Sequence, residues 1–193
     1  MKNIFAVALA ALAISAAPAL AASNKHAKKT VSDQTFMKEA AIGGMEEVEL
    51  GNLAKQKASS NDVKQFGERM ATDHGKADEN LKKIAQQKSI QLPTALDAKH
   101  KATVDRLSKL SGEAFDKAYM KEMLSDHKHD VAAFKKESTS AKDADVKQFA
   151  SNTLPTLEDH LKLAQDTASK VGVSTTAATS GHTSKKSKKG SGL

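Results

Sequence analysis

Hydrophobic positions recur every three to four residues between positions 33 and 171, which is the repeat of an amphipathic α-helix. Ser32 and Asn61 are candidate N-cap residues, and Gly172 suits the position just after a helix C-terminus. Pro155 predicts a kink or a local break in the last helix. The pattern predicts helices at 33–59, 61–89, 95–110, 113–139 and 144–171.

The four longer segments pair as two helical hairpins. A short polar turn follows residue 59 and another follows residue 139, whereas the connection at 90–111 is longer and contains Pro93 and the short helix. The same five residues, Asp-Val-Lys-Gln-Phe, begin at position 62 and again at position 145, which indicates an internal duplication. We therefore expect an all-α protein, a ferritin-like four-helix bundle of two helical hairpins with a crossover containing a short helix.

The two ends of the chain lack this periodicity. Lys2, the apolar stretch at 4–17 and the small-x-small sequence at 19–21 are typical of a secretory signal peptide. The alternative is an uncleaved membrane anchor, although the apolar run is shorter than the ~20 residues that a span needs. We interpret residues 1–21 as the signal peptide, 22–32 as a polar linker, 33–171 as the bundle and 172–193 as a disordered basic tail.

A cleaved signal peptide predicts a mature chain that is secreted across the inner membrane and is periplasmic or associated with the cell envelope. No second apolar segment is long enough for a transmembrane span. The chain has 193 residues with no Cys, no Trp and 4% aromatic residues. This composition excludes disulfides, thiolate metal sites and a cysteine nucleophile, and it argues against surfaces on which bases stack.

The formal charge of +7 comes from 30 basic and 23 acidic residues, but the excess lysines lie at the two ends of the chain. The predicted bundle is therefore close to neutral and offers no basic stripe of the kind that binds nucleic acid. The basic ends have two interpretations. They either contact anionic envelope surfaces or remain solvated and disordered.

Four segments carry a resemblance to a known family. In residue type and spacing they resemble the bacterial secreted family called domain of unknown function 4142 (DUF4142), whose members are often labelled outer-membrane proteins. The resemblance covers about residues 33–170 and implies a ferritin-like helical fold and export, but no particular reaction. The segments are Gly43–Gly51 (GGMEEVELG), Arg69–His74 (RMATDH), Gly112–Asp116 (GEAFD) and Leu154–His160 (LPTLEDH).

Several acidic and imidazole side chains fall on the apolar faces of the predicted helices. His74, His127 and His160 lie within the apolar stripes of three helices, and Glu47 lies on the apolar side of a fourth. Counted from the hairpin turns, all four positions lie near the middle of the bundle. We therefore predict a transition-metal site, which ferritin-like bundles build from side chains on facing helices. Its candidate ligands are Glu47, His74, Asp126, His127 and His160, with Asp73, Asp130, Met70 and Met123 as secondary candidates.

The same pattern has a metal-free interpretation, in which the buried histidines and carboxylates hydrogen-bond to one another. Carboxylate and imidazole ligands suit Fe, Mn or Zn, yet the Glu-x-x-His pairs of di-iron bundles are absent. Met70 precedes His74 by four residues and Met123 precedes His127 by four, a spacing that suits Cu(I). Buried methionines at helical spacing are also common as core filler.

Two functional hypotheses follow. The first is an exported metal-binding bundle that serves in storage, buffering or stress protection. The second is a metal-free envelope interaction or stress-response protein that acts through its surface and basic ends. The sequence contains no nucleotide-binding loop, nucleophile elbow or HExxH motif, so no catalytic residues are assigned and catalysis stays an open question.

Overall fold

The computed structural model describes residues 23–175, apart from the side chains of 23–32. Within this part of the chain every regular element is an α-helix. The predicted signal peptide (1–21) and most of the predicted tail (176–193) lie outside the described residues. The helices are α1 (Ser23–Lys57), α2 (Asn61–Gln87), α3 (Ala98–Ser108), α4 (Gly112–Ser140) and α5 (Ala144–Lys170).

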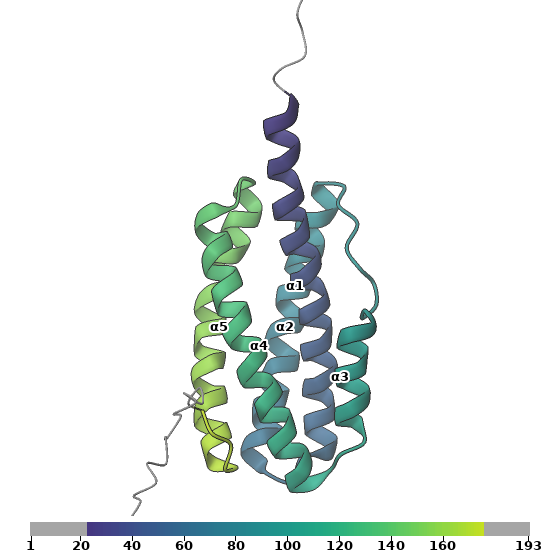
Figure 1. Cartoon of the computed structure of the whole chain (residues 1–193), viewed down its shortest axis with the longest axis vertical. Coiled ribbons are helices and arrows are strands. Elements are labelled where there is room, and N and C mark those ends of the chain that lie inside the picture. Colours follow the sequence, from purple (N-terminus) through teal and green to yellow (C-terminus); the bar gives the residue numbers. More distant parts are fainter. Residues whose placement is uncertain (1–22, 176–193) are drawn as a thin grey trace, which may run out of the picture.

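The start of α1 differs from the sequence prediction. The helix begins at Ser23 rather than at residue 33, so residues 23–32 of the predicted linker are helical, and Ser32 is not an N-cap. Figure 1 shows the first turns of α1 extending beyond the ends of the neighbouring helices. This segment contains neither Pro nor Gly, so no helix-breaking residue separates it from the rest of α1.

The other helix ends lie within three residues of the predicted positions. At the end of α5, Gly172 has φ +76°, the Gly172 N–H donates to the Ser169 carbonyl, and the Val173 N–H donates to the Ala168 carbonyl. This Schellman arrangement confirms Gly172 as the helix-terminating residue. In contrast, α5 continues through Pro155, so the predicted local break was wrong.

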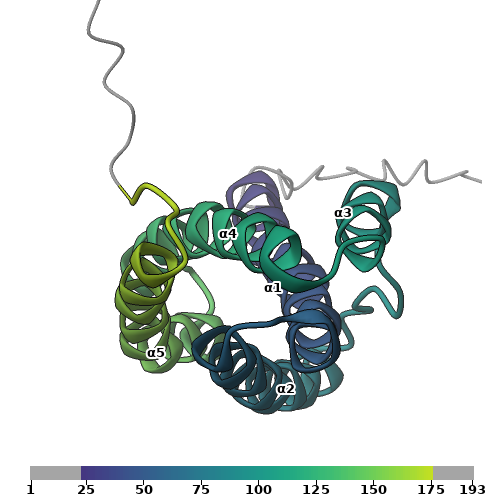
Figure 2. The same ribbon diagram turned by 90° about the horizontal axis from the view of Figure 1, so that it is seen from below.

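The four long helices pack side by side as two hairpins, α1–α2 and α4–α5. Contacts between α1 and α4 and between α2 and α5 join the hairpins. Figure 2 looks along these helices and shows α3 outside the group, where it packs mainly on α1. The crossover therefore places its short helix against the outer side of α1, as Figure 1 also shows.

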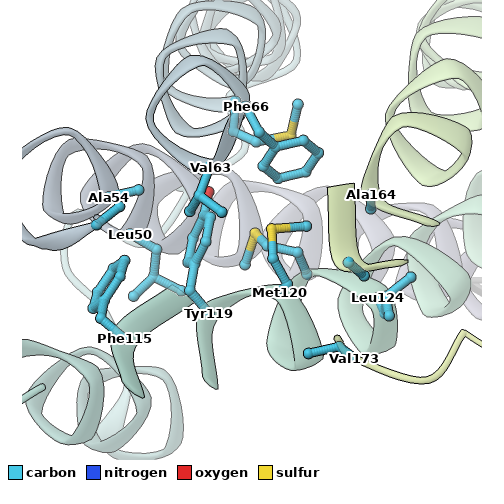
Figure 3. Close-up of a cluster of buried hydrophobic side chains, with 14 of the residues drawn as sticks. Leu50, Ala54, Val63, Phe66, Phe115, Tyr119, Met120, Leu124, Ala164 and Val173 are labelled. Atoms are coloured by element: carbon cyan, nitrogen blue, oxygen red, sulfur yellow. The ribbon is translucent and has the colours of Figure 1, made fainter. Parts of the chain in front are cut away.

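The apolar core consists of two clusters separated along the helices. One contains Phe66, Phe115 and Tyr119, and Figure 3 shows side chains from all four long helices gathered there. The other contains Phe36 and Phe134. Along each long helix, buried polar residues lie between the positions that contribute to the two clusters. They are Glu46 and Glu47 in α1, His74 and Asp78 in α2, His127 in α4 and His160 in α5.

Buried aspartates cap the turns of the opposite hairpins. Asp116 in α4 accepts hydrogen bonds from the backbone N–H groups of Ser59 and Ser60, at 3.1 and 2.9 Å, in the α1–α2 turn. The Ser60 side chain itself makes no capping bond, and the predicted cap Asn61 is the first residue of α2. Asp33 in α1 accepts from the N–H groups of residues 142 and 143 in the α4–α5 turn, at 2.9 and 2.8 Å.

This reciprocal capping supports the predicted duplication. The 83-residue offset that relates position 62 to 145 also relates Asp33 to Asp116, and residues 59 and 60 to 142 and 143. The same offset relates Ser89 (φ +54°) to Gly172 (φ +76°) at the ends of α2 and α5. Each hairpin thus supplies the cap that the other one needs.

Candidate metal centre

Three histidines from three helices converge in the polar layer between the two apolar clusters. His74, His127 and His160 are 7%, 0% and 1% exposed. Their ring centroids lie 5.4 to 5.7 Å apart. One ring nitrogen from each residue lies within 4.8 Å of the other two. We call this group the trihistidine cluster.

Hydrogen bonds fix the tautomers of two of these rings. The Nδ1–H of His127 donates to the carbonyl of Met123 at 3.0 Å, and the Nε2–H of His160 donates to Oδ2 of Asp73 at 3.0 Å. In a neutral imidazole the second nitrogen is then an acceptor with a free lone pair. These acceptors, Nε2 of His127 and Nδ1 of His160, are buried and find no hydrogen-bond donor within residues 33–175.

His74 completes the group with a third unpartnered nitrogen. Its Nε2 atom is also buried and has no hydrogen-bond partner among the described side chains. A buried polar atom without a partner costs free energy, and an isolated case requires an explanation such as a strained site or a bound ion. Here three such atoms belong to three rings of one cluster, so a shared ligand would account for all of them.

Burial keeps the three rings uncharged at neutral pH. It lowers the pKa of His74 well below the ordinary histidine value, and the neighbouring His127 and His160 lower it further. Burial lowers the pKa of His127 to about 4. For His160, the effect of burial outweighs the opposing effect of Asp73, and the pKa is lowered. Three neutral imidazoles with free lone pairs are the form in which histidine binds metal ions.

Glu47 lies beside the trihistidine cluster but on the outer side of His127. Its Oε1 atom is 3.5 Å from Nδ1 of His127, the nitrogen that is bound to the Met123 carbonyl, rather than near the free Nε2. Glu47 is 3% exposed, and neither of its oxygens has a hydrogen-bond partner in the described structure. Burial, reinforced by Asp126 and Asp130, raises the pKa of the Glu47 carboxyl well above its ordinary value.

A cleft of about 570 Å³ opens next to the cluster, with His74 and Glu47 in its lining. Its other ionisable residues come mainly from α1, α4 and the start of α3, and we call it the acidic cleft. Burial raises the pKa of Asp126 to about 7 and that of Asp130 to about 6. The lining includes the acidic residues Glu39, Glu46, Glu47, Asp78, Asp97, Asp126 and Asp130, together with Lys99, His100 and His129.

The structure therefore divides the predicted ligand set. The three histidines come together, whereas Asp126 does not join them and lies in the acidic cleft with Asp130. The reason is the helical rotation of about 100° per residue, which turns Asp126 away from the direction of His127. Asp73 is hydrogen-bonded to His160 on the side away from its free nitrogen.

The two predicted methionine ligands belong to one of the apolar clusters. The side chains of Met70 and Met123 are fully buried in the cluster that contains Phe66 and Tyr119. Among histidines and carboxylates in the described part of the chain, the group of three or more potential ligands is the trihistidine cluster, and it includes no carboxylate. Between these two residue types the candidate donors are therefore nitrogen atoms, and the Asp73 carboxylate is hydrogen-bonded to one of the rings.

Sequence reasoning missed the contribution of α3 to this region. His100 Nε2 lies 3.9 Å from an oxygen of Glu46 in α1. Glu46 is 7% exposed, and α3 packs on α1. Asp97, the N-cap of α3, lies in the lining of the same cleft. A helix pattern cannot reveal these residues, because it does not show where a crossover helix packs.

Comparison with solved structures establishes the fold. A DUF305 protein from Streptomyces coelicolor has 15% identity and a TM-score of 0.64, with 76% of this chain and 96% of that chain covered. A DUF305 fragment from Deinococcus radiodurans has 12% identity and a TM-score of 0.63, and the match covers 72% of this chain and 95% of the fragment. CopM in its Cu(II)-bound form has 15% identity and a TM-score of 0.61, and the match covers 72% of this chain and 96% of CopM. The fold is thus a DUF305-like helical fold, and the ferritin-like arrangement stays a prediction.

Comparison at the level of sequence identifies the family. The curated proteins include no match. No helix in the described residues combines the length and apolar character that a membrane span requires. The family match extends over residues 7–167, which include all residues of the trihistidine cluster. The chain therefore belongs to the family described as domain of unknown function (DUF4142).

Proposed function

We propose that this protein is an exported metal-binding helical bundle that holds one transition-metal ion between His74, His127 and His160. Two observations carry the proposal: one ring nitrogen of each histidine lies within 4.8 Å of the other two, and each ring has a buried nitrogen without a hydrogen-bond partner in the described structure. Among the described side chains, Asp73 provides a partner for the outer nitrogen of His160 only. One ion shared by the three rings would provide a partner for all three.

The donor set favours copper, zinc or iron over manganese. Imidazole nitrogen suits copper, zinc and iron, whereas manganese prefers oxygen ligands, and the converging atoms include no carboxylate. A zinc ion with bonds of about 2.0 Å holds tetrahedral ligand nitrogens about 3.3 Å apart. The rings therefore need to approach one another by about 1.5 Å at most. A protein of the same fold, CopM, is known in a Cu(II)-bound form.

The surroundings of the cluster support a binding role rather than catalysis. The carboxylate of Asp73 orients His160, which is a common arrangement around metal-bound histidines. The described residues around the rings include no activated nucleophile, so storage, buffering or stress protection fits better than turnover. Export is supported by the signal-like sequence at 1–21, and the Streptomyces coelicolor protein of this fold is described as a candidate secreted protein.

Metal binding at equilibrium tests the proposal. The metal-free mature protein is titrated with Cu²⁺ and with Zn²⁺ in the presence of a competing chelator, and bound metal is measured after desalting. We expect about one ion per chain and an increase in Tm on loading. The double variant His74→Ala/His160→Ala should lose both effects. His160→Gln, which keeps most of the side-chain volume, provides a second variant if the double variant unfolds.

A matched control removes the same number of imidazoles from the ends of the chain. His26→Ala/His182→Ala should bind metal as the wild type does, because both positions lie outside the bundle sequence. Equally weak binding by the wild type and by His74→Ala/His160→Ala would overturn the proposal. Loss of binding in the control variant would place the ion at the ends of the chain and would overturn it as well.

A further inference from the structure

The acidic cleft ends on two buried side chains whose polar atoms lack partners. His74 and Glu47 both contribute to its lining, although they are only 7% and 3% exposed. The Nε2 atom of His74 and both oxygens of Glu47 have no hydrogen bond within the described structure. The cleft is therefore more than a group of surface carboxylates, because it reaches a ring of the trihistidine cluster.

Carboxyl groups predominate along the cleft. Seven of them contribute to the lining, against Lys99, His100 and His129 as basic residues on its walls. They come from α1, α2 and α4 and from Asp97 at the start of α3, so carboxyl groups surround the opening. Narrow spaces with walls of low dielectric constant concentrate such fields and raise the local concentration of oppositely charged ions. The lining therefore attracts cations from solution.

The carboxylates of the cleft are not arranged to retain an ion. The three histidines hold three ligand atoms close enough to share a metal ion, and no carboxylate in residues 33–175 takes part in such a group. Separate carboxylates that attract a cation without enclosing it favour rapid passage. In contrast, the three nitrogens next to the cleft surround a common point.

We infer that the acidic cleft is the route by which a divalent cation reaches the trihistidine cluster, and that Asp126 and Asp130 attract the ion along this route. The inference rests on the proposed metal-binding function and adds how the ion arrives. The ion passes the carboxylates of α4 and is captured by His74, the member of the cluster in the lining of the cleft. The final site keeps its three nitrogen ligands.

Removing charge from the cleft tests the attraction. The double variant Asp126→Asn/Asp130→Asn is mixed with Co²⁺ in a stopped-flow instrument at about pH 8, and visible absorption of the bound ion is followed at low salt. We expect association to slow by about tenfold, within the range known for electrostatic steering. The difference should become small in 1 M salt, which screens the charges. The absorption spectrum at saturation should stay that of the wild type.

The control variant Glu68→Gln/Glu79→Gln changes the net charge by the same amount. Both side chains are exposed on α2, and neither contributes to the cleft. Association should stay within about twofold of the wild-type rate. If this control slows association as much as the cleft variant does, the effect reflects overall charge, and the proposed route is wrong.

A second variant closes the route without changing charge. Gly43 lines the cleft, and a Cβ atom at this position meets no other atom within 4 Å. Gly43→Leu therefore places an apolar side chain in the opening and also improves helix propensity, so the fold is retained. Loading with Co²⁺ and removal by a chelator should both slow by a similar factor, because a blocked route hinders movement in both directions.

The outcomes separate the two proposals. A wild-type protein that binds no ion overturns both of them. A wild-type protein that binds one ion, together with cleft variants that load and release at wild-type rates, overturns the route and leaves the trihistidine site standing. Slower loading in Asp126→Asn/Asp130→Asn and in Gly43→Leu, with unchanged rates in the control, supports both.

Discussion

At the scale of single residues, position within one helical turn decides the role of each polar group. Asp126 and His127 are neighbours in sequence, yet one lies in the acidic cleft and the other points into the trihistidine cluster. The pair Asp73 and His74 divides in a similar way, since Asp73 binds the outer nitrogen of His160. A rotation of about 100° per residue is enough to place adjacent side chains in different environments.

The buried carboxyl group of Asp78 predicts a measurable pH dependence of stability. Burial raises its pKa to about 6, partly offset by Lys82. In the unfolded chain the pKa is about 3.9, so between about pH 4 and pH 6 the unfolded state releases a proton that the folded state keeps. The free energy of unfolding therefore decreases as pH rises through this window, and the contribution from this residue is constant above it.

Asp78→Asn removes this titration and keeps the shape of the side chain. We expect the variant to match the wild type near pH 4 and to exceed its free energy of unfolding by about 1–3 kcal/mol at pH 7. Urea unfolding at the two pH values measures the difference. Glu79→Gln, at an exposed position of the same helix, is the matched control for the acid-to-amide substitution. If Asp78→Asn lowers the free energy of unfolding equally at pH 4 and at pH 7, the raised pKa of Asp78 is contradicted, because the effect of the substitution would then not depend on ionisation of the carboxyl group.

At the scale of elements, the pairing of α1 with α2 depends on close approach of their backbones. A Cβ atom on Gly51 would overlap the carbonyl oxygen of Gly67, and one on Gly67 would overlap Ala54 and the backbone of Gly51. Gly51 and Gly67 therefore allow the two backbones to pack closely. Gly43, in contrast, faces open space.

Substitution to alanine is therefore expected to have opposite effects at Gly51 and at Gly43. Gly51→Ala forces the helices apart, and we expect a net loss of about 1–3 kcal/mol in the free energy of unfolding despite better helix propensity. Gly43→Ala adds a methyl group without a clash and should gain up to about 1 kcal/mol. Urea denaturation of both variants provides the measurement. Equal effects at the two positions would show that backbone proximity does not limit residue 51.

At the scale of the whole molecule, the two hairpins stabilise each other at both ends of the bundle. Asp33 and Asp116 accept backbone N–H groups from the turn of the opposite hairpin, and these turns would otherwise leave donors unsatisfied. Two apolar clusters hold the hairpins together on either side of the polar layer. The trihistidine cluster therefore lies where packing on both sides limits movement of the helices.

The reciprocal caps predict similar and independent losses of stability. Asp33→Ala and Asp116→Ala should each lower the free energy of unfolding by about 1–3 kcal/mol, since each removes a charged acceptor from two backbone donors. The two sites lie at opposite ends of the bundle, so the loss of stability in the double variant should equal the sum of the two single losses to within about 0.5 kcal/mol. Asp116→Asn keeps one acceptor oxygen, so its stability should lie between those of the wild type and Asp116→Ala. Wild-type stability in either alanine variant would contradict the capping role.

Helix positions followed from the sequence because apolar periodicity and end signals act locally. Four of the five helices and the Gly172 terminus lie close to the predicted positions, and the three histidines were expected on buried faces. The early start of α1 was not predicted, and of the two alternatives for Pro155, a kink or a local break, the break does not occur. At these positions the local signals, a polar composition and one proline, are weak beside the tendency of an established helix to continue.

The sequence by itself determined which residues form helices and which faces of those helices are buried, since both depend on the order of side chains within a few turns. Only the tertiary structure decided that Nε2 of His127 and Nδ1 of His160 remain free, and that Asp126 belongs to the cleft. It also placed α3 on α1, which buries Glu46. These features depend on the relative rotation and height of separate helices, which long-range packing sets and local periodicity does not encode.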